Sequence, residues 1–365
     1  MEDRNQRGGF NIVRGTRELL METALLDRVA EKVLRESLGV RAGETVTIES
    51  WNTGLEFAMR VVVQSRRVGA TPILLLEDED AFVEGHRKTP KAHVGEMGRH
   101  EYALLSKTNA YVFIPGPVLG GSPRLSRKEA TASTAYNSSW YAAAKKARLR
   151  GVRMLFGYVG PELAEILRKP VRRIAEHQLE ASLVDLSIVR RKGVSLSKRL
   201  KPRASVTLRA EGETLRFDLG KEEAIDDGVV SADDMAAGGN MTNVPPGYYA
   251  REIVAPSLNG SVRLYAPVPR IGSVADLRLE FRRGRLVRWE SETSQRWVSD
   301  LVRTTPKERR TFGALAIGLN PALRNGYGQD RLVDGAVTFF GMFQGTSRPA
   351  DLEVGGRDVV REGRL

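Results

Sequence analysis

Three apolar runs constrain the fold of the first half of this chain more than any other feature. They lie in "GATPILLLEDED" (69–80), "AYVFIPGP" (110–117) and "VRMLFGYVG" (152–160). Continuous apolar runs of this length are typical of buried parallel strands. Helical stretches around 139–149 and 161–180 alternate with them. The alternation predicts an α/β domain with a mostly parallel sheet.

Before these runs, the residues around 24–38 have the periodicity of an amphipathic helix. Its predicted buried stripe consists of Leu25, Leu26, Val29, Val33, Leu34 and Leu38. Gly39 is placed to end this helix. A short β-rich run at 43–50 follows, and we expect Thr53 to cap a helix from Gly54 to Arg67.

The pattern changes at about residue 194, where short alternating strands replace the helical periodicity. Examples are "ASVTLRAEG", "TLRFDLG" and "SVRLYAPVP", and one helix is expected at about 291–303. Alternation with a period of two predicts an antiparallel, β-rich, barrel-like α+β domain. We therefore predict a flexible lead-in at 1–20, an α/β domain at 21–195 and a β-rich domain at 196–365, with the boundary in "RRKGVSLSKRLKP".

Composition excludes several classes of protein. The chain has no cysteine, so it forms no disulfide and has no thiolate nucleophile or cysteine-ligated zinc. It has no apolar run of membrane-spanning length and no secretory signal, and we expect a cytoplasmic protein. The net charge of +12 is compatible with a nucleic-acid partner. The basic residues are dispersed, which favours a solvated basic surface over nucleic-acid binding.

Two motifs outside the expected core are candidates for ligand binding: a glycine-rich loop and a series of histidines. The loop "GPVLGGSPR" follows a strand, and Arg124, Arg127 and Lys128 make it a candidate anion-binding site. The loop lacks the spacing of a Walker loop or dinucleotide fingerprint, so an ordinary loop is the favoured interpretation. His86, His93 and His100 recur every seven residues. On a helix they would be about 10 Å apart, too far to share one metal.

Ordered segments along most of the chain resemble the M29 aminopeptidase family, the aminopeptidase T group. These include "LDRVAEKVLRESLGVRAGETVTIES", "RGVRMLFGYVGPELAEIL" (150–167), "GETLRFDLG…DDG" (212–228), "NVPPG" (243–247) and "FGALAIGLN" (312–320). The resemblance implies a homodimer of two-domain subunits in which the C-terminal domain holds two catalytic metal ions. It implies two glutamate, two histidine and one aspartate ligand, with metal-bound water as nucleophile. Ring-cleaving dihydroxypyridine dioxygenases share the scaffold and hold iron through two histidines and an aspartate.

This sequence departs from the family at the ligand positions. The glutamate that follows the Pro-Pro-Gly turn corresponds to Tyr248, and the second glutamate corresponds to Ala314. The family's Gly-Thr-x-His corresponds to a segment ending at Thr338, and its last His-x-Asp corresponds to one ending at Asp351. No histidine lies after His177. We therefore predict no metal site of the family type and no cofactor.

The favoured hypothesis is a metal-free binding protein that keeps the M29-like scaffold, forms a homodimer and binds a peptide, small molecule or protein in its interdomain cleft. One alternative is an enzyme with a rebuilt site, in which Tyr248, Tyr249, Arg251 and Asp351 serve as acid, base and anion-holding groups. A second is a metal-dependent aminopeptidase whose ligands lie elsewhere in the alignment. A third is a basic nucleic-acid-binding protein.

Overall fold

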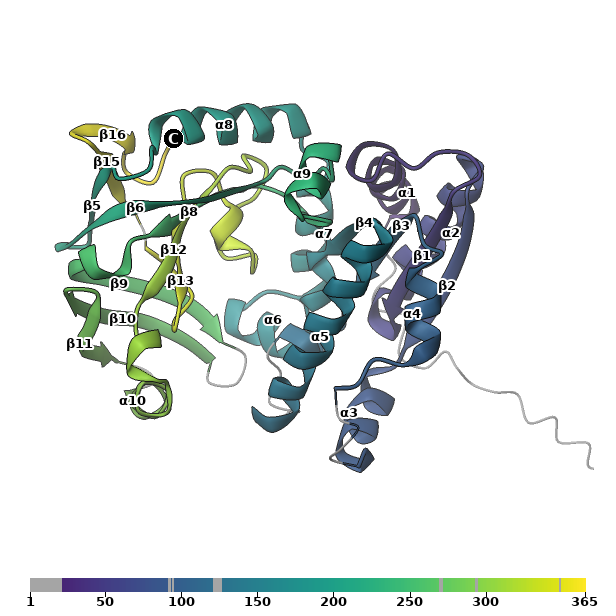
Figure 1. Cartoon of the computed structure of the whole chain (residues 1–365), viewed down its shortest axis with the longest axis horizontal. Helices are drawn as coiled ribbons and strands as arrows, with labels where there is room; N and C mark the ends of the chain where they lie inside the picture. Colours follow the sequence, from purple (N-terminus) through teal and green to yellow (C-terminus); the bar gives the residue numbers. More distant parts are fainter. Residues whose placement is uncertain are drawn as a thin grey trace, which may run out of the picture.

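The computed structural model of this chain describes residues 22–365 except 91–92, 94, 121–126, 269–271, 293–294 and 348. The predicted lead-in at 1–20 lies outside the described residues. The chain folds into two lobes, and each lobe is built around its own sheet (Figure 1). Helix α8 (Leu186–Arg199) runs along one side of the β-rich lobe towards the other lobe. No helix within the described ranges is long and apolar enough to span a membrane.

The N-terminal lobe contains a five-stranded parallel sheet with the order β2-β1-β3-β4-β7. Helices α1, α2 and α7 pack on one face of the sheet, and α4 and α5 pack on the other. This two-sided cover confirms the predicted α/β class. The strands are β1 (Thr45–Trp51), β2 (Thr71–Glu77), β3 (Ala110–Ile114), β4 (Arg150–Met154) and β7 (Met241–Val244).

The helices of this lobe follow the predicted periodicity. The stripe from Leu26 to Leu38 is fully buried, and a π-helical turn at Val33–Ser37 ends the first helix before Gly39, which has a φ of 54°. The helices are α1 (Thr23–Lys32), α2 (Leu55–Arg67), α3 (Glu79–Lys88), α4 (Arg99–Leu105), α5 (Arg127–Ala147), α6 (Pro161–Leu167) and α7 (Val171–Ala181).

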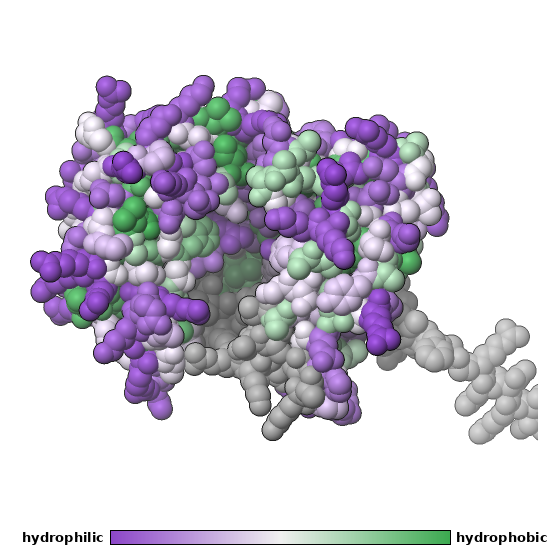
Figure 2. Space-filling view, in the orientation of Figure 1, coloured by the Kyte–Doolittle hydropathy of each residue, from purple (hydrophilic) through white to green (hydrophobic). Residues whose placement is uncertain are grey.

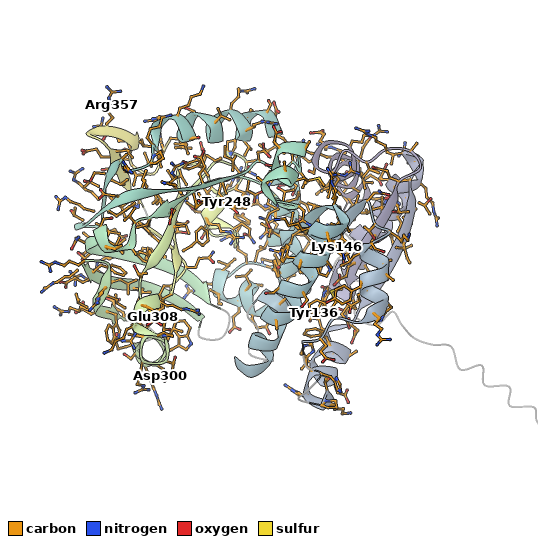
Figure 3. The ribbon with its side chains drawn as sticks, viewed as in Figure 1. Tyr136, Lys146, Tyr248, Asp300, Glu308 and Arg357 are labelled. Carbon is orange, nitrogen blue, oxygen red and sulfur yellow. The ribbon has the colours of Figure 1, made fainter. Side chains whose placement is uncertain are left out.

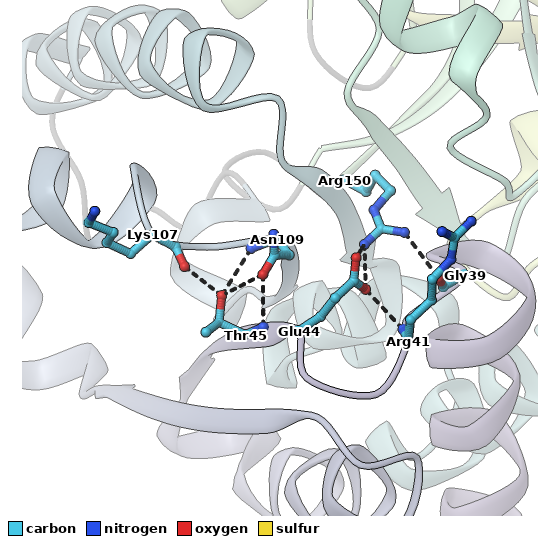
Figure 4. Close-up of polar contacts among 7 residues, drawn as sticks. All are labelled: Gly39, Arg41, Glu44, Thr45, Lys107, Asn109 and Arg150. Carbon is cyan, nitrogen blue, oxygen red and sulfur yellow. Dashed lines mark hydrogen bonds and ion pairs between the residues drawn. The ribbon is translucent and has the colours of Figure 1, made fainter.

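Polar side chains tie together the amino ends of the parallel strands (Figure 4). Arg150 Nη2 lies 2.7 Å from both carboxylate oxygens of Glu44, and its Nη1 donates to the Gly39 carbonyl at 3.0 Å. The Thr45 amide donates to Asn109 Oδ1 at 2.9 Å. This edge is therefore closed by internal hydrogen bonds, whereas the segment that follows the carboxyl end of β4 packs against the second lobe.

The C-terminal lobe is an antiparallel sheet that closes on itself, as the barrel-like prediction requires. Its order is β11-β10-β9-β14-β13-β12-β8-β6-β5-β15-β16, and a further β9–β6 pairing closes the ring from β9 to β6. The ring is formed by β6 (Glu213–Asp226), β8 (Tyr248–Ile253), β9 (Asn259–Val268), β12 (Phe312–Gly318), β13 (Val337–Gly341) and β14 (Gly345–Ser347).

Outside the ring, the sheet continues on both sides. The added strands and the remaining helices are β5 (Ser205–Ala210), β10 (Gly272–Arg282), β11 (Arg285–Ser291), β15 (Asp351–Val354), β16 (Arg357–Val360), α9 (Ala232–Ala237) and α10 (Gln295–Thr304). The barrel interior is an apolar core that includes Phe217, Phe281, Phe312 and Phe339. Phe312 stacks on Phe339 with ring centroids 4.8 Å apart, so aromatic packing joins neighbouring strands.

Two local predictions were wrong. The run at 69–80 forms β2, which is parallel as predicted but lies at the sheet edge, where Ile73 is 47% and Leu76 57% exposed. Thr53 does not cap α2, because the capping position is Gly54 and no side chain caps it. The segment near 190–200, in which the predicted boundary lies, is mostly helix α8.

The predicted division between residues 195 and 196 does not separate the two sheets completely. Strand β7 belongs to the later part of the chain, yet it pairs in parallel with β4. The chain therefore returns from the barrel to the N-terminal sheet and then re-enters the barrel as β8. This return places the carboxyl ends of β4 and β7 against the barrel.

Candidate functional site

The Pro-Pro-Gly turn joins β7 to β8 and sets the position of Tyr248. Gly247 has a φ of 131°, and a β-carbon there would lie 2.8 Å from Asn320 Cβ. The buried Asn320 side chain donates to the carbonyls of Pro246 and Ala181 at 2.8 and 3.2 Å. Glycine is therefore required at 247, and the turn is held rigidly against the segment that follows β12.

Side chains on β8 alternate between the barrel interior and its outer face. Tyr249 and Ile253 pack in the barrel core. Tyr248 points the other way and packs with Leu155, Leu323 and residues near them. Figure 3 shows Tyr248 where the barrel faces the helices of the other lobe, and Figure 2 shows a surface hollowed between the two lobes. The outer face of the barrel thus lines an interlobe cleft.

The sheet register separates the positions at which the resemblance places metal ligands. Tyr248 lies opposite Gly318, and Ala314 lies opposite Glu252. Four residues along a strand correspond to about 13 Å, so Ala314 is remote from Tyr248. Thr338 lies on β13 opposite Ala316 and is 1% exposed. Its hydroxyl is 3.0 Å from the Thr346 hydroxyl.

Two other candidate residues are not at the cleft. Asp351 lies on β15 opposite Arg209, and β5 and β6 separate it from β8. Its carboxylate accepts a hydrogen bond from the Glu362 amide at 2.6 Å. Arg251 is 3% exposed and alternates with Tyr248 on the strand, so it points into the barrel. The structure therefore does not bring Tyr248, Arg251 and Asp351 together.

Arg251 forms a buried polar network with two neighbours. Its Nη1 lies 2.5 Å from Glu223 Oε2, and its Nε donates to the Gly220 carbonyl at 3.0 Å. The Tyr249 hydroxyl donates to the same Glu223 oxygen at 2.9 Å. Burial and this carboxylate raise the pKa of Tyr249. The network satisfies a charge inside the barrel wall, which is a structural role.

The residues around the cleft do not fit the metal ions that the resemblance implies. Among the residues whose placement is described, no three histidine, cysteine, aspartate or glutamate side chains converge as a metal site requires. A dinuclear site of the family type needs glutamates and histidines, and Tyr248, Ala314 and Thr338 supply neither a carboxylate nor an imidazole. No catalytic step through a metal is therefore derived.

A different group of polar side chains gathers where the two sheets meet. Asp226 ends β6 directly opposite Tyr248. Its carboxylate accepts from Thr242 Oγ1 at 2.6 Å and from Asn243 Nδ2 at 2.7 Å. Because β7 belongs to the parallel sheet, these bonds join the two lobes. Asn243 in turn lies beside Arg153, near the carboxyl end of β4.

Two arginines and three tyrosines surround this carboxylate, and we call them the arginine–tyrosine cluster. Its members are Tyr141 on α5, Arg153 on β4, Tyr158 just after β4, Tyr248 on β8 and Arg331 at 330–332. All five are half-buried. Arg153 Nη2 donates to the Tyr141 hydroxyl at 2.5 Å. The Nε–H groups of Arg153 and Arg331 are both buried and have no hydrogen-bond partner among the described residues.

The cluster consists mainly of hydrogen-bond donors. Burial, and then the charge of Asp226, raise the pKa of Tyr248 to about 12, so its phenol is protonated at neutral pH. Burial also raises the pKa of Tyr158. Desolvation lowers the pKa of Arg331 although Tyr248 and Asp226 oppose it. Arginine nevertheless remains charged in proteins, because its reference pKa is very high.

Asp226 is the carboxylate that acts most strongly on the guanidinium of Arg331. Burial raises the pKa of Asp226, and its bonds to Thr242 and Asn243 oppose this only in part. Two guanidinium groups thus face one carboxylate whose acceptor sites are largely occupied. The site has a surplus of positive charge and of donors.

The predicted anion-binding loop cannot be compared with this cluster. Arg124 lies outside the described residues, and the side chains of Arg127 and Lys128, at the start of α5, are also not described. His93 and His86 make local contacts, with Glu96 and the Phe82 carbonyl respectively.

A second, small hollow lies beside α7. The amide of Arg324 donates to His177 Nε2 at 3.1 Å, and the His177 ring lies 4.0 Å from that of Tyr327. Burial and the neighbouring Arg324 lower the pKa of His177. The hollow, of about 160 Å³, is lined by Arg173, His177, Glu180, Ala181, Ala322, Arg324 and Tyr327. It contains none of the family's ligand positions.

Sequence reasoning identified Tyr248 but missed the rest of the cluster. One signal was available, because Arg153 interrupts the apolar run of a buried strand, where charged residues are rare. Arg331 lies in a segment without a distinctive pattern, and nothing in the quoted segment 212–228 marks Asp226 as a site residue. Strand pairing within the barrel places Asp226 opposite Tyr248, and the contact between the two lobes adds Arg153.

The comparisons with known proteins bear on the fold. No protein-family model matches the sequence, and no curated protein matches it significantly. The structure is similar to wild-type AmpT from Thermus thermophilus, with a TM-score of 0.68 and 15% identity over 94% of this chain and 99% of that one. It is also similar to 2,5-dihydroxypyridine dioxygenase from Pseudomonas putida KT2440, with a TM-score of 0.59 and 14% identity over 95% and 98% of the two chains.

At these identities the likeness shows the fold alone. The predicted aminopeptidase T-like scaffold is confirmed, over nearly the whole chain.

Proposed function

We propose that this protein is a metal-free member of the scaffold that binds a ligand in the interlobe cleft and has no aminopeptidase activity. The observation that carries the proposal is the composition of the outer barrel face, which presents Tyr248, Ala314 and Thr338, the residues to which the resemblance assigns three of the family's ligands. None of these side chains provides the charged or imidazole donors that would hold two divalent ions.

The cleft keeps features of a binding site. It lies at the carboxyl edge of a parallel sheet, where ligands of α/β proteins bind most often. The side chains of the arginine–tyrosine cluster are half-buried, and they combine polar groups with aromatic rings. Both lobes contribute residues beside the cluster, because Asp226 lies on β6 of the barrel and its hydrogen-bond donor Asn243 lies on β7 of the parallel sheet. A ligand held there would contact both.

The test is the metal content of the purified protein, followed by activity. We expect no stoichiometric zinc, cobalt, manganese or iron by elemental analysis after incubation with each metal and desalting. We also expect no hydrolysis of amino-acid amides or p-nitroanilides in their presence. Two tightly held ions per chain, or metal-dependent aminopeptidase turnover, would overturn the proposal.

A further inference from the structure

We infer that Arg331 and Arg153 hold the oxyanion of the cleft's ligand, a carboxylate or phosphate group. This inference rests on the proposed use of the cleft and specifies the ligand's chemical class. It starts from two buried guanidinium nitrogens, the Nε atoms of Arg153 and Arg331, that have no partner among the described residues. Buried donors are nearly always satisfied, so such atoms point to a missing partner.

The orphaned donors lie in one region. Arg153 lies beside Asn243, which donates to Asp226, and Asp226 lies opposite Tyr248. Arg331 directly precedes Leu332, which packs with Tyr248 and Tyr158. Both side chains are half-buried, not sealed inside the core, so each has a part that solvent or a ligand can reach. Placing two guanidinium groups near each other is electrostatically unfavourable unless an anion offsets them.

Asp226 offsets only part of this charge. Its oxygens accept from Thr242 Oγ1, Asn243 Nδ2 and, at 3.2 Å, the Asn243 amide. Neither arginine forms an ion pair with it within 4.0 Å among the described residues, although such pairs occur elsewhere, as between Arg251 and Glu223. With one carboxylate and two guanidinium groups, the cluster retains at least one uncompensated positive charge.

The other polar groups select an acceptor. The phenols of Tyr248 and Tyr158 stay protonated at neutral pH and can donate hydrogen bonds. A ligand group that only accepts hydrogen bonds, and that is negatively charged, satisfies these donors together with the arginine forks. Carboxylate and phosphate groups meet both conditions and match the planar geometry of guanidinium. A neutral acceptor such as a carbonyl lacks the charge, and a cationic group is repelled by both arginines.

The experiment compares three probes of similar shape: benzoate, phenyl phosphate and benzyl alcohol. Binding to the full-length protein is measured by calorimetry and by the shift in Tm. We expect one or both anions to bind and the neutral alcohol not to bind. Preference for benzoate identifies a carboxylate ligand, and preference for phenyl phosphate identifies a phosphate ligand.

Variants assign the binding to the cluster. Arg331→Met and Arg153→Met should each weaken anion binding by about 10- to 100-fold, the loss of one charge-assisted contact. Arg357→Met, the same change at an exposed arginine on β16 (Figure 3), should leave binding unchanged. Without ligand, Arg331→Met should melt at or above the temperature of the wild type, because it removes a desolvated and unpaired charge. A purely structural arginine would instead lower Tm when replaced.

Equal binding of the alcohol and the anions would overturn the inference, and so would unchanged anion binding in both cluster variants. No Tm shift with either anion at about 10 mM, where a millimolar site is mostly filled, would also overturn it. These results are separate from those of the metal test. A metal-containing protein that binds anions through Arg331 would refute the proposed function alone, whereas a metal-free protein that ignores anions would refute this inference alone.

Discussion

Glu49 on β1 provides a sharp test of the electrostatics inside the N-terminal lobe. Its carboxylate accepts a hydrogen bond from the Tyr111 hydroxyl on the neighbouring strand β3. Burial raises the pKa of Glu49 from its ordinary value of 4.5 to about 7, with further contributions from the charges of Glu101 and Glu77. The Tyr111 bond acts in the opposite direction. The perturbation is Glu49→Gln, which mimics the protonated form.

The sign of the effect follows from proton linkage. Between pH 4.5 and about 7 the folded protein binds more protons than the unfolded chain, so the free energy of unfolding falls as pH rises. The difference between the two pKa values corresponds to about 3 kcal/mol, at about 1.36 kcal/mol for each pH unit. Since the side chain is only half-buried and solvent screens part of this cost, we expect about 1–3 kcal/mol.

Glu49→Gln should therefore be more stable than the wild type at about pH 8 and should lose this advantage below about pH 4.5. Urea unfolding followed at several pH values measures the difference. Tyr111→Phe should raise the pKa of Glu49 further, because it removes the hydrogen bond to the carboxylate. Glu222→Gln is the matched exposed control. A stability difference for Glu49→Gln that is the same at all pH values would refute the reasoning.

Three further predictions concern the barrel and the subunit surface. Ala314→Glu should destabilise the protein by about 0.5–1 kcal/mol in urea unfolding, because the new carboxylate lies directly opposite Glu252 on the next strand. Arg251→Ala should cost about 1–3 kcal/mol, since it removes a buried guanidinium and its hydrogen bonds, while Glu223, whose side chain is 37% exposed, stays solvated. We expect a homodimer at micromolar concentration by light scattering, and Met59→Asp, on an exposed apolar stripe of α2, should convert it to a folded monomer.

Each of these has a control and a result that contradicts it. Ala314→Gln adds a side chain of similar size without the charge and should cost less stability than Ala314→Glu. Equal losses of stability in the two variants would exclude repulsion from Glu252 as the cause. Arg209→Ala removes an exposed ion pair with Glu353 and should cost less than about 1 kcal/mol of stability. If Arg251→Ala cost no more than Arg209→Ala, the structural role of Arg251 would be contradicted. Val194→Asp on α8 should leave the dimer intact, and a wild-type monomer would end the dimer prediction.

Periodicity in the sequence was a good guide to the elements and a poor guide to their surroundings. The amphipathic stripe from Leu26 to Leu38 predicted α1 correctly because one helix presents one face to its core. The apolar run of β2 predicted a buried strand, yet Ile73 and Leu76 are exposed. A run of apolar side chains shows that a strand is suited to burial. It does not show whether another element of the structure covers that strand.

The candidate site was predictable only at one residue. Tyr248 follows the Pro-Pro-Gly turn, which can be recognised in the sequence. Close contact with Asn320 requires the glycine at 247. The structure does not bring Arg251 and Asp351 to Tyr248, since Arg251 points into the barrel and Asp351 lies beyond β5 and β6. Side-chain alternation on β8 would have separated Tyr248 from Arg251 before the structure was known.

The sequence by itself determined the two classes of sheet and the absence of cysteine. These properties are local, because they depend on residue type and on spacing within single elements. Only the tertiary structure decided which residues share the cleft. Strand register, the return of the chain through β7 and the contact between the two lobes place Asp226, Arg153, Tyr248 and Arg331 together. Those arrangements depend on pairings between distant segments, whose free energies no single stretch of sequence contains.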